Sequence, residues 1–151
     1  MLSSGRCILS VMKWSRRDLP LLLPALLAAQ TPAPNQPLPS SIFRHEDIPP
    51  RKSRTIQSRQ MLRGGTRSGY QIDLHETELL AGEAPHPPHQ HVHEEMLLIR
   101  DGLLDVTIDG KTTRLGPGSA AYLASNQLHG WRNVGATPAR YFVLALGDDK
   151  V

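Results

Sequence analysis

The sequence predicts an all-β protein: a small antiparallel double-sheet jelly-roll barrel, preceded by a signal peptide and a Pro-rich extended arm. Two observations predict this class. From Tyr70 onward the chain shows no 3.6-residue hydrophobic period, so amphipathic helices are not expected. Short β-favourable runs are instead separated by Gly, Pro and Asp-Gly turns. We expect a signal peptide over residues 1–29, a Pro-rich linker and N-terminal arm over 30–66, and the barrel domain over 67–148.

The beginning of the chain has the parts of a secretory signal. Residues 13–29 start with basic side chains, continue as an apolar run and end in small residues. The apolar run of about 11 residues is shorter than the roughly 20 that span a bilayer, so no stable membrane anchor is expected. Residues 15–19, Ser-Arg-Arg-Asp-Leu, resemble a twin-arginine export signal. The alternative is a basic N-terminus followed by a short amphipathic helix. The signal predicts a periplasmic or secreted protein that is cleaved between Ala28 and Ala33.

Charge and cysteine content exclude several classes of function. The chain has 17 Lys and Arg against 14 Asp and Glu, but four of the positive and one of the negative side chains precede residue 30. The remaining body is therefore formally neutral and has no basic patch with interleaved aromatics, which argues against a nucleic-acid partner. The single cysteine, Cys7, lies in the leader. A disulfide framework and a cysteine nucleophile are therefore not expected in the body.

The segment before the barrel is expected to be extended. Residues 31–50 contain six prolines, a density that favours a polyproline-like linker over a packed element. Residues 51–66 are polar and basic, and a strand is expected around Arg54–Leu62.

The barrel is expected to consist of eight short strands joined by sharp turns. The clearest is a hairpin at Asp109-Gly110, because a two-residue type I′ turn needs positive φ at both central residues. Its register places Val106 opposite Thr113. A second corner is expected at 116–118, Gly-Pro-Gly. The expected strands are Tyr70–Glu78, His89–His93, Glu95–Arg100, Leu103–Asp109, Lys111–Leu115, Ser119–Ala124, Gly130–Val134 and Arg140–Leu146.

Four of the seven histidines lie between residues 86 and 93. They fit a loosely metal-binding His-rich tract or a surface strand without function. The spacing favours a defined site, because in a strand His89 and His91 point to the same face, about 6–7 Å apart. Glu95 is six residues from His89, about 20 Å along a straight strand, which bonds of about 2.1 Å to one ion cannot span. If Glu95 is a ligand, the chain must bend after His91, and this would turn His93 and Glu94 away.

This stretch resembles the first motif of the cupin superfamily. The match consists of His89-x-His91, three residues, Glu95, six residues and Gly102. The resemblance extends over roughly residues 70–146, about half of the chain.

The second cupin motif is also present in part. Gly118, His129 and Asn133 are in register, whereas Ala124 and Asn126 replace the usual Pro and Gly. Asn is the most tolerant non-glycine residue at positive φ, so Asn126 can form the turn.

The resemblance implies a mononuclear metal site. Its ligands would be His89, His91, Glu95 and His129, holding one divalent transition metal. Mn or Fe is favoured, and Ni, Co, Cu or Zn also suit three imidazoles and a carboxylate. The resemblance also implies a small-molecule ligand or substrate, and a homodimer paired through strand edges.

Three functions remain open at this point, and the sequence does not decide whether the chain is an enzyme. The first is an oxygenase acting on a small organic or aromatic substrate. The second is a metal-dependent isomerase or hydrolase in which Glu95 is catalytic. The third is a non-catalytic module that binds a carboxylate or sugar acid with the metal as anchor. An apolar pocket with an open metal fits an oxygenase and a binding module equally well. If the chain is an enzyme, a metal-dependent dioxygenase is favoured. The expected lining is Leu97, Ile99, Leu104, Val106, Leu128 and Val143, with Tyr122, Trp131 and Tyr141 as the substrate-contacting side chains.

Overall fold

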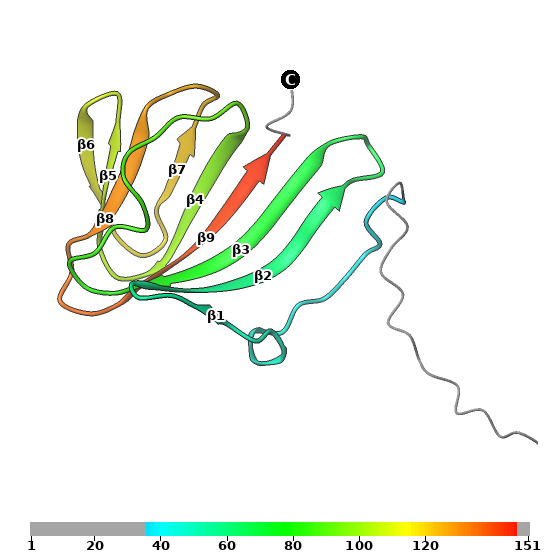
Figure 1. Ribbon diagram of the computed structural model, residues 1–151, viewed down its shortest axis with the longest axis horizontal. Coiled ribbons are helices and arrows are strands. Elements are labelled where there is room, and N and C mark those ends of the chain that lie inside the picture. Colours follow the sequence, from blue (N-terminus) through cyan, green and yellow to red (C-terminus); the bar gives the residue numbers. More distant parts are fainter. Residues whose placement is uncertain (1–35, 148–151) are drawn as a thin grey trace, which may run out of the picture. The chain divides into compact units, whose positions relative to one another are not determined.

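The computed structural model describes residues 36–147 (Figure 1). The predicted export signal and its cleavage site lie outside the described residues. Between residues 36 and 147 the regular structure is β, apart from one 3-10 turn. None of that segment forms a helix with the length and hydrophobicity needed to cross a membrane. The predicted all-β class is confirmed.

Nine strands form two antiparallel sheets in the described segment (Figure 1). The larger sheet has the order β1-β2-β3-β9-β4-β7, and the smaller has the order β6-β5-β8. The elements are η1 (His45–Asp47), β1 (Arg51–Lys52), β2 (Ile56–Gly65), β3 (Gln71–Leu79), β4 (Glu94–Asp101), β5 (Leu104–Ile108), β6 (Lys111–Leu115), β7 (Ala120–Leu123), β8 (His129–Asn133) and β9 (Ala139–Leu146).

Apolar side chains from both sheets form one core. Strand alternation directs every second residue inward, so that apolar residues of β4 and β9 meet Leu104 and Val106 of β5 and Trp131 of β8. The predicted double-sheet barrel is therefore confirmed. The core consists of Leu79, Leu97, Ile99, Leu104, Val106, Leu123, Trp131, Ala139, Tyr141 and Val143.

Both predicted turn residues adopt positive φ. In the β5–β6 hairpin, Asp109 and Gly110 have φ of 47° and 81°, and Val106 pairs with Thr113 as expected. The Asp109 carboxylate also accepts hydrogen bonds from the Leu128 amide (3.2 Å) and the Gln127 side chain (3.0 Å). The hairpin is thereby fixed to the loop that leads into β8.

The expected strand His89–His93 is wrong. Only His89 forms an isolated bridge, to His129, and regular pairing begins at Glu94. Val92 and His93 form a bend instead. The bend required between His91 and Glu95 is therefore present, and it interrupts the strand.

The strand expected around Arg54–Leu62 is present as β2, with a bulge between Gln60 and Leu62. It pairs along its length with β3, so the larger sheet begins before residue 67. The domain boundary at residue 67 stays a prediction.

Residues 36–50 lie against the larger sheet. The Leu38 amide donates to the Gly65 carbonyl (2.8 Å), and Arg59 donates to the Ile48 carbonyl (3.2 Å). His45 contacts Glu76 of β3 at 2.8 Å, and this carboxylate is only 2% exposed. This part of the expected arm is therefore held by specific polar contacts.

Candidate metal centre

Three segments bring the four predicted ligands together. His89 and His91 lie in the loop before β4, Glu95 is the second residue of β4, and His129 is the first residue of β8. Two 2.9 Å backbone hydrogen bonds join His89 to His129. The amide of Asn126, whose φ is 60°, donates to the His91 carbonyl (2.8 Å). The predicted Asn turn therefore fixes the loop that carries His91.

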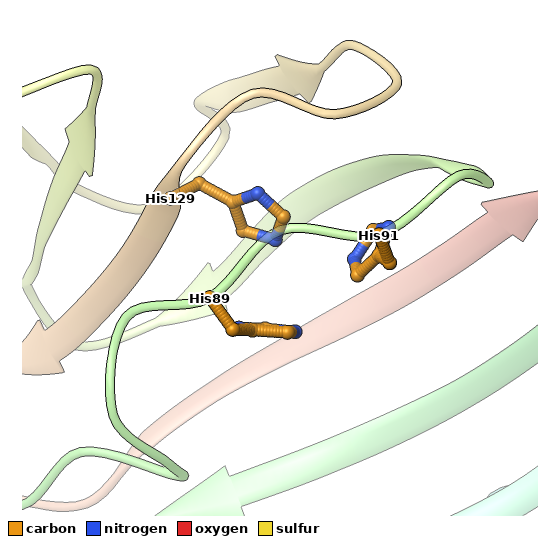
Figure 2. A group of neighbouring side chains, drawn as sticks. All are labelled: His89, His91 and His129. Carbon is orange, nitrogen blue, oxygen red and sulfur yellow. The ribbon is translucent and has the colours of Figure 1, made fainter.

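The three imidazole rings lie around a common space (Figure 2). Their ring centroids are 4.7–5.1 Å apart and their planes are inclined by 55–73° to one another. One nitrogen from each of His89, His91 and His129 lies within 4.8 Å of the others. Lone pairs lie in the ring planes, so mutually inclined rings can point at one ion.

Glu95 faces this group. Its Oε2 atom is 3.6 Å from His91 Nε2 and 3.5 Å from His129 Nε2. Ligand atoms that share an ion at about 2.1 Å lie roughly 3.0–4.2 Å apart. These two distances therefore suit a shared ion. His89 belongs to the same group, because one of its ring nitrogens lies within 4.8 Å of those of His91 and His129.

Hydrogen bonding fixes which nitrogens carry lone pairs. His91 Nδ1 lies 2.7 Å from the His93 carbonyl, and His129 Nδ1 lies 2.8 Å from the Gln127 carbonyl. A carbonyl only accepts, so each Nδ1 carries the hydrogen and each neutral ring has its lone pair on Nε2. Both Nε2 atoms therefore present lone pairs to a carboxylate.

These lone pairs are buried without a hydrogen-bond partner among residues 36–147. The atoms concerned are His91 Nε2, His129 Nε2 and Glu95 Oε2. Buried acceptors that face one another repel and are costly unless a donor or cation lies between them. The residues present therefore fit a divalent metal ion, which, by distance, either of two groups could hold: His89, His91 and His129, or His91, His93 and Glu95.

His89 is also suited to bind a metal. Burial lowers its pKa, and the charges of the neighbouring histidines lower it further. A lower pKa keeps the ring neutral at physiological pH, which is the form that ligates metals.

His93 is close to the centre, but its orientation excludes it from sharing an ion with His91. Its Nε2 is 3.5 Å from Glu95 Oε1, and its ring stacks on His91 at 3.6 Å with an interplanar angle of 8°. An ion held between parallel rings would lie far out of both ring planes, where no lone pair points. The bend does not turn His93 away from the centre as expected, because its ring lies against His91 and Glu95.

His86 lies at the edge of the centre. Its ring centroid is 4.2 Å from that of His89 and 5.4 Å from that of Trp131. It also lines a surface groove of about 320 Å³ with Trp131.

The cavity beside Glu95 is polar. It has a volume of about 410 Å³. The aliphatic residues expected to surround the ion, such as Leu97 and Leu104, are instead fully buried in the core. The expectation of an apolar pocket is therefore not met in this cavity. Its lining is Arg63, Gly64, Gln71, Ile72, Asp73, His75, His93, Glu95, Ala145 and Gly147.

The three residues expected to contact substrate lie in different surroundings. Trp131 is stacked 6.3 Å from His129, and Tyr141 packs edge-on behind it at 5.8 Å. Burial raises the pKa of Tyr141, so its hydroxyl stays protonated. Tyr122 is 51% exposed and pairs with Met96, the residue after Glu95, so strand alternation places it on the other face of the sheet.

Sequence reasoning missed the polar wall of the cavity. Gln71, Asp73 and His75 alternate along β3, so their side chains share the inward face. This period-2 polar pattern was a signal, but the partners from β2 and β4 that complete the cavity are distant in sequence.

Comparison with known proteins identifies the fold. Residues 75–145 match the family described as "Cupin domain". No curated protein matches the sequence.

Three solved structures illustrate the similarity. KdgF from a Halomonas species superposes with a TM-score of 0.63 at 19% identity, covering 72% of this chain and 95% of that one. An RmlC-like cupin from Shewanella frigidimarina superposes with a TM-score of 0.62 at 13% identity, covering 74% of this chain and 95% of that one. A predicted oxalate decarboxylase from Thermotoga maritima superposes with a TM-score of 0.62 at 16% identity, covering 72% of this chain and 100% of that one. These superpositions show a shared fold. The match to the family over residues 75–145 identifies that segment as a cupin domain.

Proposed function

We propose that this chain binds one divalent transition metal through His89, His91, Glu95 and His129, and uses it to hold a small polar organic molecule. The observation that carries the proposal is the set of buried lone pairs with no hydrogen-bond partner among the described residues. A bound divalent ion supplies Lewis acidity and open positions for ligand oxygen atoms.

The cavity supports a polar ligand. Glu95 belongs both to the histidine cluster and to the cavity wall, so a molecule in the cavity lies next to the ligand set. The remaining wall is mostly charged or hydrogen-bonding, which favours a polar molecule over the aromatic substrate that an apolar lining would have selected. Glu95 would position the molecule and take part in any proton transfer.

Metal content tests the proposal. Protein loaded with Mn(II) and freed of excess metal by gel filtration should retain about one ion per chain, measured by elemental analysis. His91→Ala and Glu95→Gln should lose most of it, because each removes a ligand. His86→Ala is the matched control, since it removes a neighbouring imidazole outside the proposed ligand set. Full retention by both ligand variants would overturn the proposed site.

Turnover is tested separately. Incubation of metal-loaded protein with a panel of small oxygenated acids, followed by mass spectrometry and an oxygen electrode, distinguishes the two outcomes. New products identify an enzyme, with oxygen uptake marking an oxygenase. Binding without chemical change identifies a metal-anchored binding module.

A further inference from the structure

The cavity wall contains a second polar cluster, centred on Asp73 of β3, which is separated from Glu95 by Ala145 of β9. One oxygen of Asp73 accepts a hydrogen bond from Gln60 (2.8 Å) and lies 3.3 Å from His75 Nδ1. The other oxygen is 3.3 Å from Arg63 Nε. Asp73 is mostly buried, with 24% of its side chain exposed. The contacts from β2 and from its own strand therefore fix the carboxylate and the two groups that flank it.

The charges around the cavity favour an anion. Arg63 and Asp73 compensate each other. A divalent ion beside Glu95 leaves one net positive charge, which raises the affinity of the cavity for an anionic molecule. The Arg63 side chain is 79% exposed at the rim, where an entering anion can reach it.

Arg63 has donors to spare. A guanidinium carries five N–H groups, and one carboxylate engages at most two of them at a time. After the contact with Asp73, the remaining donors can bind a carboxylate of the ligand in the planar geometry that arginine favours.

His75 supplies an acceptor. The carboxylate of Asp73 only accepts, so the hydrogen of a neutral His75 lies on Nδ1 and the lone pair lies on Nε2. That lone pair can accept a hydrogen bond from a ligand hydroxyl. His75 lines the cavity together with Arg63 and Glu95.

We propose that the cavity is a two-ended site for a small hydroxylated carboxylic acid. Arg63 binds a carboxylate, His75 accepts a hydrogen bond from a hydroxyl, and a second oxygen-bearing end of the acid lies at the Glu95 side. A volume of about 410 Å³ accommodates an acid of several carbon atoms. The inference rests on the proposed function, because the net positive charge depends on a bound ion.

Calorimetric titration of Mn(II)-loaded protein tests the inference with malate, a hydroxylated diacid, and butyrate, a monoacid of the same carbon number. We expect malate to bind at least about tenfold more tightly than butyrate. The substitution Arg63→Gln should lower the affinity for malate by at least about tenfold and leave the metal content unchanged. Arg67→Gln is the matched control, because Arg67 lines a different hollow with Leu38. Its affinity for malate should equal that of the wild type.

The outcomes separate the two proposals. Wild-type affinity for malate in Arg63→Gln, equal affinity for butyrate, or failure of malate to bind the metal-loaded protein would each overturn the inference and leave the metal site intact. If the metal-free protein binds malate as tightly as the loaded protein, and Arg63→Gln still weakens it, the Arg63 subsite stands and the role of the ion in ligand binding is rejected.

Discussion

Glu76 and Glu95 are two buried carboxylates on the larger sheet, and they lie on opposite faces of it. Glu76 pairs with Phe142 and Glu95 with Ala145, positions of opposite parity on β9. The exposed fractions of their side chains are 2% and 12%. Their surroundings differ in the charge of the side chains that the protein places next to each carboxylate.

The chain itself compensates Glu76. Arg100 donates a hydrogen bond to one of its oxygens. The other oxygen has no hydrogen-bond partner among residues 36–147, but it has Arg59 at 4.0 Å and His45 at 2.8 Å. Oε2 of Glu95 instead faces the Nε2 atoms of His91 and His129, which carry lone pairs when the rings are neutral. A buried carboxylate must be paired or coordinate a metal; two arginines pair with Glu76, whereas the contacts of Glu95 are to histidines. The difference makes Glu76 a structural carboxylate and makes the surroundings of Glu95 suited to an external cation.

The largest expected effect is the stabilisation of the fold by bound metal, which should differ between variants at Glu76 and at Glu95. At a free Mn(II) concentration 100 times its dissociation constant, the free energy of unfolding of the wild type should rise by about 2.7 kcal/mol. Glu76→Gln should keep this increment, and Glu95→Gln should lose most of it because a ligand is missing. Urea unfolding with and without Mn(II) measures it. Equal increments in both variants would break the comparison.

The second-largest effect is expected when a positively charged side chain next to Glu76 is removed. Arg100→Met should lower the free energy of unfolding by about 2 kcal/mol, because it removes a partner of a buried carboxylate. The control is Arg114→Met, whose partner Asp105 lies on the β5–β6 hairpin with more solvent around the pair; its cost should stay below about 1 kcal/mol. A similar cost for both, measured by urea unfolding, would show that Glu76 does not depend on Arg100.

Neutralising Glu95 in metal-free protein should have a smaller effect of the opposite sign. At pH 8, Glu95→Gln should leave the free energy of unfolding unchanged or raise it by up to about 1 kcal/mol, because a charge that faces the Nε2 atoms of His91 and His129 is removed. Chelator-treated protein in urea provides the measurement. A loss as large as that of Glu76→Gln would reveal a positive partner for Glu95 within the chain.

The smallest effect concerns pH. The folded state lowers the pKa of His89 below its ordinary value of 6.5, so the unfolded state binds more protons near that value. The stability of metal-free protein should therefore rise with pH, and should fall as the pH drops below about 6.5 through the lowered pKa. His89→Gln should flatten this dependence between pH 7 and 5, measured by thermal unfolding. Identical slopes in the two proteins would contradict the assignment.

Local chemistry made the barrel and the meeting of His89, His91, Glu95 and His129 predictable. The Asp109-Gly110 turn defined the register of its hairpin because only special residues adopt positive φ at both positions. The distance that bonds to one ion can span required a bend between His91 and Glu95, although this same bend removed the strand expected over His89–His93.

The polar clusters could not be predicted in the same way. Asp73 depends on Gln60 and Arg63, and Glu76 on Arg100, so each needs partners from other strands whose register no local pattern specifies. Inward-facing aliphatic positions also do not show whether they line a cavity or fill a core. The packing of both sheets decides that, and here it places Leu97 in the core.

The two oxygens of Glu95 face different neighbours, Oε2 toward His91 and His129 and Oε1 toward His93 at the cavity wall. A single carboxylate shared in this way would link the proposed binding of an ion and of a cavity ligand thermodynamically. Whatever factor the ion adds to the affinity for a cavity ligand, that ligand must add to the affinity for the ion. At a limiting metal concentration, the availability of the organic acid would therefore determine how many copies of this protein are loaded.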